Sequence, residues 1–356
     1  MTEKRTDKSS KVSKNTSSVL YRKYRPFDWS DVVGQEHIVS VLENSIKLER
    51  IAHAYLFSGS RGTGKTSIAR IFSRALGVSD NDIYEIDAAS NRGIDDIREI
   101  RDGVSVLPFE SRFKVYIIDE VHMLTKEAFN ALLKTLEEPP AHALFILATT
   151  ETEKIPETVV SRCQVFSFKK PNRDILKALV SKVAKKEGYE LETGAPDLIA
   201  LLGDGSFRDS LGILQKVISS SETEKISIKD IEKITGAPKG SLVNDFINAI
   251  SKNEKEKALG AISSAREGNI SMKTFIALIL EKVRIILLIK NAPALAKTLE
   301  EQVSEDDWKL LKNLAEEKNM KITSATLLEL LKSYDATGKA YIETLPLEMG
   351  VIAILG

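Results

Sequence analysis

One short segment has the residue types and the spacing that can hold a chain of phosphate groups. Three of its eight positions are glycine, and a lysine and a threonine end it. A short apolar run (54–57) precedes it, and a stretch with helical periodicity (67–76) follows it. Glycines allow backbone N–H groups to wrap around phosphate oxygens, and the N-terminus of the following helix adds positive partial charge. This P-loop (Walker A) segment, which predicts nucleotide binding, consists of Gly59, Ser60, Arg61, Gly62, Thr63, Gly64, Lys65 and Thr66.

The end of this segment and a later acidic pair have the chemistry to hold a metal ion and activate water. The pattern assigns Lys65 to the β- and γ-phosphates and the Thr66 hydroxyl to Mg²⁺. Asp119 and Glu120 follow an apolar run at 115–118. A carboxylate at a strand end can hold Mg²⁺ through water, and the next one can polarise the attacking water. Acidic pairs after strands also commonly start helices, but the phosphate-binding segment favours Asp119 as the metal-side residue and Glu120 as the catalytic base.

Three further residues are ambiguous by type alone. Thr150 follows the apolar run at 144–148 and could orient water or sense the γ-phosphate, although threonine is also an ordinary strand residue. Arg162 and Arg208 could each neutralise charge in a phosphoryl-transfer transition state, or form ordinary salt bridges. We expect Cys163 to be a small packing residue and the four histidines to have ordinary structural roles.

The composition narrows the class of protein. The chain has 356 residues, of which 42% are hydrophobic, so wholesale disorder is excluded. Lys and Arg number 51 and Asp and Glu number 51, which argues against a protein that coats DNA by bulk charge. A single cysteine excludes a disulfide scaffold and a cysteine-cluster zinc site. Neither a membrane-spanning apolar run nor the apolar core of a signal peptide is evident, so we expect a cytosolic protein.

The elements that must position these residues belong to an α/β domain followed by helices. Short apolar runs alternate with helical stretches, which predicts a parallel sheet with helices on its faces; the runs are 54–57, 83–86, 115–118, 144–147 and 165–168. After Pro171 strands become scarce and amphipathic helices follow one another. We expect a flexible tail or DNA-tethering arm over 1–18, an α/β core over 19–171, a small helical domain over 172–238 and a helical C-terminal domain over 239–356.

Several longer motifs resemble the gamma/tau subunits of bacterial DNA polymerase III, the AAA+ ATPases of the sliding-clamp loader. They are 24–26, 31–36, the P-loop, 86–91, 118–124, 129–140 and 161–163. The resemblance is dense over 19–171 and thinner through Arg208 to 345–348. It implies an AAA+ P-loop core, a helical lid over 172–238, and a collar or oligomerisation domain over 239–356.

The resemblance also implies roles for individual residues. Thr150 resembles the first sensor residue and Arg208 the second, which reaches the nucleotide from the lid. Arg162 resembles the arginine that is inserted in trans into a neighbouring subunit's site. The implied nucleotide contacts are Arg25 and Val33 near the adenosine, the P-loop, Ser67 and Asp119. Arg98, Lys126 and Thr158 resemble positions that face the DNA backbone, although helix cations are more often simply solvated.

The function that the resemblance implies is that of a DNA-replication motor. ATP binding and hydrolysis, with Mg²⁺, would drive the opening of a sliding clamp and its loading onto primed DNA. The family bears the name of a DNA polymerase, but this chain itself should not polymerise. The implied partners are subunits of the delta and delta-prime type, further copies of this chain in a pentameric ring, the clamp, primed DNA and a single-strand-binding protein. The implied location is the cytoplasm, at a nucleoid-associated replisome, without a membrane.

Two departures from the family pattern bear on this expectation. The family usually carries a four-cysteine zinc module after the P-loop helix, but residues 75–82 lead directly to the next strand without a cysteine. We therefore expect no zinc. The chain also stops at Gly356, so we expect it to lack the C-terminal extension of the longer form, which ties helicase and polymerase to the loader.

Two other functions remain open at this point. Another AAA+ DNA machine would form a closed hexamer and usually carry a DNA-reading C-terminal domain. The C-terminal helices here show no basic recognition helix. A non-enzymatic loader subunit would donate an arginine without hydrolysing ATP, but such a protein has no physical need for Lys65, Thr66, Asp119 and Glu120 together.

Overall fold

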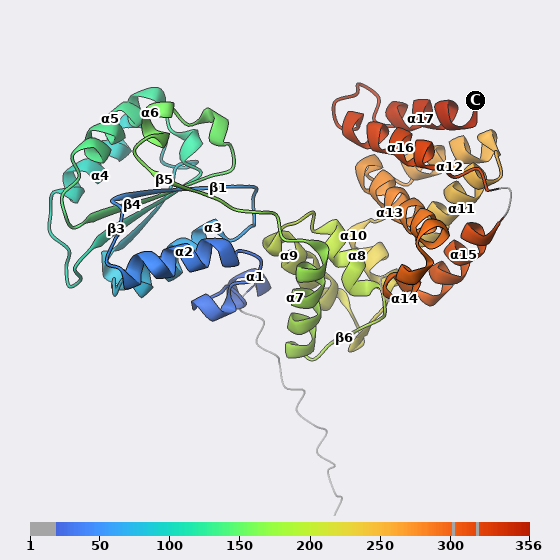
Figure 1. Cartoon of the computed structure of the whole chain (residues 1–356), viewed down its shortest axis with the longest axis horizontal. Helices are drawn as coiled ribbons and strands as arrows, with labels where there is room; N and C mark the ends of the chain where they lie inside the picture. Colours follow the sequence, from blue (N-terminus) through green and yellow to red (C-terminus); the bar gives the residue numbers. More distant parts are fainter. Residues whose placement is uncertain (1–18, 301–302, 318–319) are drawn as a thin grey trace, which may run out of the picture.

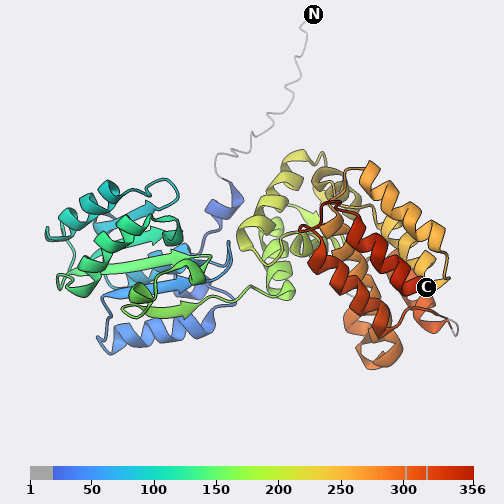
Figure 2. The ribbon, with the colours of Figure 1, turned by 90° about the horizontal axis from the view of Figure 1, so that it is seen from above.

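The computed structural model describes residues 19–300, 303–317 and 320–356, so the expected tail at 1–18 lies outside the described residues. Three parts follow one another along the chain, and two perpendicular views agree that the second lies between the others (Figures 1 and 2). We call them the sheet region (29–168), the lid region (172–236) and the collar region (240–356). The domain boundaries expected above stay predictions.

The sheet region contains the parallel sheet that the apolar runs predict. Its strands lie in the order β2-β3-β4-β1-β5, and each neighbouring pair is parallel. The bounds are β1 Ala54–Ser58, β2 Ile83–Asp87, β3 Lys114–Asp119, β4 Ala143–Thr149 and β5 Gln164–Ser167. The central strands β1 and β4 are buried along their whole length, as expected of strands covered on both faces. The five expected strands are therefore confirmed.

Helices cover both faces of this sheet (Figure 1). On one face α2 (Glu36–Lys47) and α3 (Lys65–Ala75) pack against side chains such as Tyr55 and Phe57. On the other, α4 (Ile94–Val104), α5 (Lys126–Glu137) and α6 (Glu157–Val160) cover a cluster that includes Leu56. Because successive strand residues point to opposite faces, β1 feeds both clusters and fixes the P-loop between them.

The lid region is a small helical unit with a short strand pair. It comprises α7 (Arg173–Lys186), α8 (Ala195–Leu202), α9 (Phe207–Ser220) and α10 (Ile228–Thr235), with β6 (Glu190–Leu191) parallel to β7 (Lys225–Ile226). The Asn172 side chain accepts a hydrogen bond from Ile175 N and caps α7, as its position before the apolar periodicity predicts. The N-terminal helix α1 (Leu20–Lys23) packs here, because Leu20 lies in the apolar cluster of this region.

The collar region is built around one apolar cluster and one long helix. It comprises α11 (Gly240–Ser251), α12 (Lys255–Glu267), α13 (Met272–Asn291), α14 (Ala296–Glu300), α15 (Glu305–Glu316), α16 (Ser324–Ala336) and α17 (Leu345–Leu355). Phe275, Ile279 and Ile286 place α13 in its centre, fully buried. None of the helices in the described ranges is long and apolar enough to span a membrane.

Candidate active site

The P-loop connects the end of β1 to the start of α3, as the sequence predicts. Gly59 and Gly62 have φ values of 146° and 74°, in the range that side chains with a Cβ rarely adopt. A Cβ on Gly59 would also lie 2.6 Å from Phe168 O, and one on Gly62 would lie 2.0 Å from Ser206 Oγ. Gly59 is therefore required by the close approach of the Phe168 backbone and Gly62 by that of the Ser206 side chain, and Gly62 brings the loop against the lid region.

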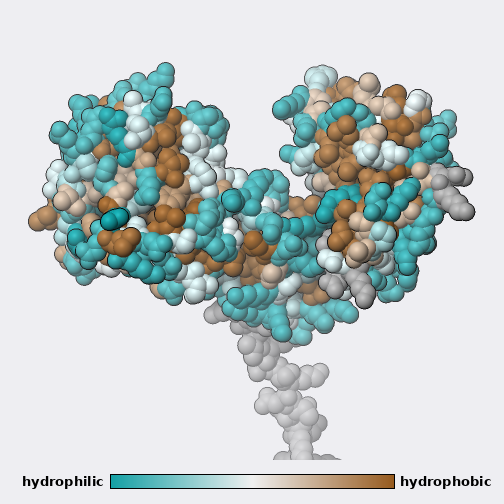
Figure 3. Space-filling model, viewed as in Figure 1, coloured by the Kyte–Doolittle hydropathy of each residue, from teal (hydrophilic) through white to brown (hydrophobic). Residues whose placement is uncertain are grey.

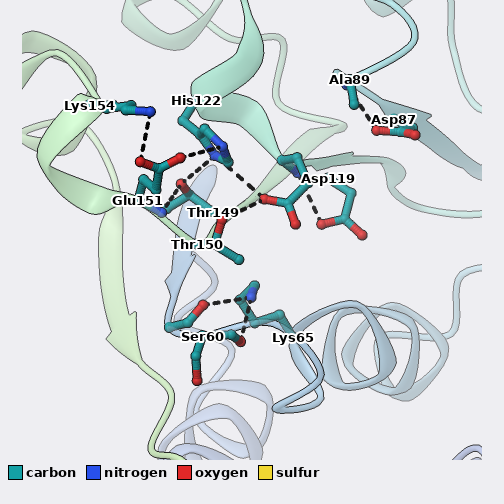
Figure 4. Close-up of polar contacts among 12 residues, drawn as sticks. Ser60, Lys65, Asp87, Ala89, Asp119, His122, Thr149, Thr150, Glu151 and Lys154 are labelled. Atoms are coloured by element: carbon teal, nitrogen blue, oxygen red, sulfur yellow. Dashed lines mark hydrogen bonds and ion pairs between the residues drawn. The ribbon is translucent and has the colours of Figure 1, made fainter. Parts of the chain in front are cut away.

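Lys65 and Thr66 begin α3 and point toward polar groups of neighbouring segments. Lys65 Nζ donates to Gly59 O at 2.7 Å and Ser60 O at 3.0 Å (Figure 4). Its burial lowers the pKa of the Lys65 ammonium, while the nearby carboxylates Glu120 and Asp119 oppose that shift. Backbone carbonyls are weak partners for an ammonium, so this side chain can be recruited by a stronger acceptor such as a phosphate oxygen.

The two carboxylates lie where β3 ends. The Asp119 carboxylate accepts a hydrogen bond from Thr66 Oγ1 at 2.8 Å, so the predicted metal-side pair is in direct contact. Glu120 follows, and its Oε2 accepts from Thr150 Oγ1 at 3.0 Å. Because β3 and β4 are adjacent parallel strands, their carboxyl ends bring Glu120 and Thr150 together.

A cavity of about 920 Å³ joins these groups to the lid region. Its walls contain predicted site residues from three places in the chain: Arg25 and Val33, residues 61–67 with the acidic pair, and Arg208 at the start of α9. Gly59, Ser60 and Thr150 are not among the residues that line it. Burial lowers the pKa of the Arg25 guanidinium, and nearby Arg70 adds to the shift. Arg208 lies over the Tyr21 ring, 4.9 Å from its centroid. The cavity has the size and polarity of a site for a nucleotide.

Other predicted residues lie away from this cavity. Arg162 follows α6, donates to Thr158 O and forms an ion pair with Glu137 at 2.7 Å. Arg98 on α4 pairs with Asp95 at 2.9 Å. Lys126 is exposed at the start of α5. The structure thus places the expected trans arginine and the expected DNA-facing residues outside the nucleotide cavity of their own chain.

Several residues that the sequence reasoning missed also line the cavity. Tyr21 contributes from α1, and the lid region contributes Lys182 and Lys186 on α7 and Phe207 on α9. Gln35 is buried and holds the loop after β5, since its side chain donates to Lys169 O at 2.7 Å. The periodicity of α7 could have indicated which of its lysines face one way, but not that this face meets the P-loop.

Cys163 is a free, partly buried cysteine. Burial raises the pKa of the Cys163 thiol to about 11, which agrees with a packing residue and not with a reactive thiolate. Within the described ranges, no group of three or more histidine, cysteine or acidic side chains is arranged to hold a metal ion.

Comparison with known proteins agrees with this geometry. The family model of the DNA polymerase III delta subunit matches residues 34–92 and 77–172. The DNA polymerase III subunit tau of Bacillus subtilis is 41% identical over 313 residues, covering 82% of this chain and 55% of the relative. Subunit tau of Escherichia coli is 38% identical over 297 residues, covering 78% of this chain and 46% of the relative. The chain belongs to the DNA polymerase III gamma/tau family.

This gamma/tau family member spans about half the length of the curated relatives it matches. Among solved structures, the Holliday junction branch migration motor RuvB of Thermotoga maritima is 19% identical with a TM-score of 0.51. That likeness covers 82% of this chain and 91% of RuvB, and at this identity it shows the fold alone. The predicted α/β core, a parallel sheet flanked by helices, and the helical parts after it are confirmed.

Proposed function

We propose that this chain is the ATPase motor subunit of a sliding-clamp loader. One observation carries the proposal. A single cavity brings together Lys65, Thr66, the pair Asp119 and Glu120, and the lid residue Arg208. A chain that only donated an arginine to a neighbour would have no need for this complete arrangement. Membership of the gamma/tau family supports the clamp loader as the assembly in which the motor acts.

The residues at the P-loop fit ATP with Mg²⁺. The Thr66 hydroxyl and the Asp119 carboxylate lie 2.8 Å apart, so their oxygens can share one small cation directly or through water. Mg²⁺, when bound there, neutralises phosphate charge. Lys65 would exchange its two backbone carbonyls for phosphate oxygens, and Arg25 and Val33 would border the adenosine. We also propose that the chain works without zinc, since residues 75–82 contain no cysteine.

Hydrolysis would then use the carboxylate that follows Asp119. Glu120 accepts the proton of the attacking water, and Thr150 orients that carboxylate through its 3.0 Å hydrogen bond. Arg208 enters from α9 and would move from the Tyr21 ring toward the γ-phosphate. Arg162 lies outside its own cavity, which suits insertion into a neighbouring subunit's site.

An apolar loop on the sheet region suits a protein partner, which we propose to be the sliding clamp. Val106, Leu107 and Phe109 are 60%, 73% and 81% exposed. The loop is nevertheless held firmly. The buried Asp82 carboxylate accepts hydrogen bonds from the backbone N–H of Phe109 and of the two residues after it. Lys114 Nζ donates to the backbone at the other end. A rigid apolar loop loses little entropy on binding.

The collar region carries an apolar surface that supports the proposed assembly with copies of the chain and with delta-type and delta-prime-type subunits. Figure 3 shows hydrophobic residues gathered on this part of the molecule. The exposed apolar residues of α16, α17 and the segment between them are Leu328, Leu331, Tyr341, Ile342, Leu345, Met349 and Ile352. Contiguous exposed apolar surface of this kind marks protein interfaces.

Primed DNA would meet a third surface. Arg98, Lys126 and Thr158 are all exposed, and they lie on α4, α5 and α6, which cover the same face of the sheet (Figure 1). The protein has equal numbers of acidic and basic residues, so it is not suited to coat DNA by bulk charge. A few cations on one face are enough to bind a short duplex. A single-strand-binding protein as further partner, and action in the cytoplasm at a nucleoid-associated replisome, complete the proposal.

The test is steady-state ATP hydrolysis by the wild type and by Lys65→Ala. Each protein is assayed alone and then with the source organism's other loader subunits, clamp and primed DNA. The proposal expects slow turnover alone, a sharp rise only with all partners, and no turnover by Lys65→Ala. Stimulation by DNA alone, without regard to clamp or partner subunits, would indicate a different AAA+ DNA machine. Absence of hydrolysis with active partners would indicate a scaffold.

A further inference from the structure

A histidine lies directly behind the proposed catalytic base. His122 belongs to the short helix η3 (Val121–Met123), which begins immediately after Glu120. Its side chain is only 6% exposed, and its Nδ1 lies 3.5 Å from Glu120 Oε2. Among the described residues that line the cavity, Glu120 is present and His122 is not. His122 is therefore placed to act on the cavity through Glu120, which it contacts.

One further segment, which begins at the end of β4, holds the His122 ring in place (Figure 4). Its Nδ1 also lies 3.0 Å from Thr149 Oγ1, at the end of β4. Its Nε2 lies 3.2 Å from Glu151 Oε1, and Glu151 Oε2 pairs with Lys154 Nζ at 2.7 Å. The hydrogen bond to Lys154, with the charges of Lys154 and His122, lowers the pKa of Glu151, which keeps it an acceptor.

The backbone at Glu120 explains why such support is needed. Glu120 has φ 50° and ψ 43°, the left-handed conformation that a residue with a side chain rarely adopts. Such a conformation costs on the order of 1 kcal/mol or more and persists only when the surroundings hold it. The surroundings here are Thr150, which donates to the Glu120 carboxylate, and His122, which ties the next residues of the chain to β4.

We propose that His122, oriented by Glu151, is a positioning residue for the Glu120 carboxylate in ATP hydrolysis. The inference rests on the function proposed above. Glu151 fixes the ring through Nε2, and the opposite edge of the ring faces Thr149 and Glu120. Loss of His122 leaves Glu120 with Thr150 as the side chain that restrains its carboxylate, so fewer of its orientations suit proton transfer from water. Nucleotide binding, which uses the P-loop, is unaffected.

The experiment separates turnover from binding in the complete loader assembly with clamp and primed DNA. The variants are His122→Ala, His122→Asn, Glu151→Gln and the double variant His122→Ala with Glu151→Gln. Each is assayed for kcat and for the Kd of a fluorescent ATP analogue. We expect His122→Ala to lower kcat about tenfold, a fraction of what a general base contributes, with Kd unchanged. Glu151→Gln alone has a smaller effect.

The kcat of the double variant distinguishes a positioning role of His122 from a merely structural one. Because Glu151 acts through His122, removing both should lower kcat no further than His122→Ala does alone. His122→Asn, which can restore a polar group near the Nδ1 position, should recover part of kcat. The matched control is His142→Ala, since His142 bonds to Val104 O at 2.9 Å, away from the cavity. That control should leave kcat unchanged even if it lowers the melting temperature.

The outcomes distinguish this inference from the proposed function. If wild-type turnover does not depend on Lys65, the proposed function fails and the inference falls with it. If wild-type turnover depends on Lys65 but His122→Ala has an unchanged or higher kcat, only the inference is overturned. An additive double variant would also overturn it. Should His122→Ala fail to fold, Glu151→Gln and His122→Asn decide the question, because unchanged kcat in both contradicts the role.

Discussion

Two buried lysines in this chain differ in their partners. Lys65 at the start of α3 and Lys282 in the middle of α13 are 6% and 7% exposed, and burial lowers the pKa of both. Lys282 Nζ donates to Asp307 Oδ1 at 2.7 Å and to Asn244 Oδ1 at 2.8 Å, on two neighbouring helices. Among the described residues, Lys65 Nζ donates only to P-loop carbonyls, while the carboxylates of the site raise its pKa from a greater distance.

The difference shows that the partners of a buried lysine indicate whether it stabilises the fold or binds a ligand. Lys282 is neutralised by a side-chain carboxylate, so its pair with Asp307 joins three collar helices and leaves no charge for a ligand. Lys65 has no direct carboxylate partner in the described residues, and two carbonyls only partly offset its desolvation. A buried ammonium that is only partly compensated is suited to bind an anionic ligand. The comparison predicts opposite consequences when each lysine is removed.

The largest expected effect is on ligand binding by Lys65→Ala. Losing two charge-assisted hydrogen bonds to phosphate removes about 3 kcal/mol, or about a hundredfold in affinity. Thermal stability should not fall, because the variant also removes a poorly compensated buried charge. Titration with a fluorescent ATP analogue and a thermal melt measure the two quantities. A variant that binds ATP normally but melts early would make Lys65 structural like Lys282.

The next effect is on stability, in Lys282→Met. It leaves the partly buried Asp307 without its cation, which should destabilise the collar region by about 3 kcal/mol. Urea unfolding measures the loss, and ATP affinity under native conditions should be unchanged. Adding Asp307→Leu to this variant should recover part of the stability, since a buried ion pair can be replaced by apolar groups. Loss of ATP affinity in a folded variant would contradict the distinction between the two lysines.

A smaller effect concerns Asp82, a buried anion whose carboxylate is held by hydrogen bonds and, within the described ranges, not by an ion pair. Burial alone would raise the pKa of Asp82, but hydrogen bonds from the backbone N–H groups of Glu110, Phe109 and Ser111 outweigh it and hold the pKa below its usual 3.8. We expect Asp82→Asn to lower the free energy of unfolding by about 2 kcal/mol at neutral pH.

The sign of the pH dependence follows from that lowered pKa. The unfolded chain binds a proton at Asp82 before the folded chain does, so this stabilisation is complete above the unfolded value of 3.8 and is lost as pH falls through the folded value. The stability gap between wild type and Asp82→Asn should therefore shrink from about pH 6 to about pH 3. Urea unfolding at both pH values measures it, and a constant gap would refute the assignment.

The smallest effect on the isolated chain is expected for Phe109→Ser. This side chain is 81% exposed, so its replacement should change stability by less than about 0.5 kcal/mol and leave basal ATP hydrolysis unaltered. If the loop binds the clamp, clamp stimulation should fall. The control Tyr341→Ser removes an exposed aromatic ring of the collar region and should leave clamp affinity intact. Equal losses of clamp affinity in both variants would remove the loop as a specific contact.

The sequence predicted the sheet and the P-loop because both depend on local pattern. The continuous apolar runs become buried strands, and Lys65, Thr66, Asp119 and Glu120 come together as the topology of a parallel sheet requires. The start of α5 is set in the same local way, since the Thr125 side chain accepts a hydrogen bond from the backbone N–H of Ala128. In each case the residue and its structural consequence are close together in the chain or follow a general rule of sheet topology.

The features that the sequence did not predict depend on contacts between distant segments. Leu20 packs in the lid region because its backbone N–H meets Gln215, 195 residues away. The sequence indicated only an ordinary structural role for His122. Its partner Glu151 follows the end of another strand, so the contact cannot be seen in the local sequence. The pairing of Lys282 with Asp307 likewise joins α13 to α15. Neither periodicity nor motif spacing specifies such pairs.

The most direct test of the account compares Glu120→Gln with Lys65→Ala and the wild type in the complete loader with clamp and primed DNA. ATP binding and ATP hydrolysis are measured on the same preparations. The account predicts that Glu120→Gln binds ATP as tightly as the wild type but loses hydrolysis about a hundredfold or more, whereas Lys65→Ala loses both. Normal hydrolysis by Glu120→Gln, or normal ATP binding by Lys65→Ala, would contradict it.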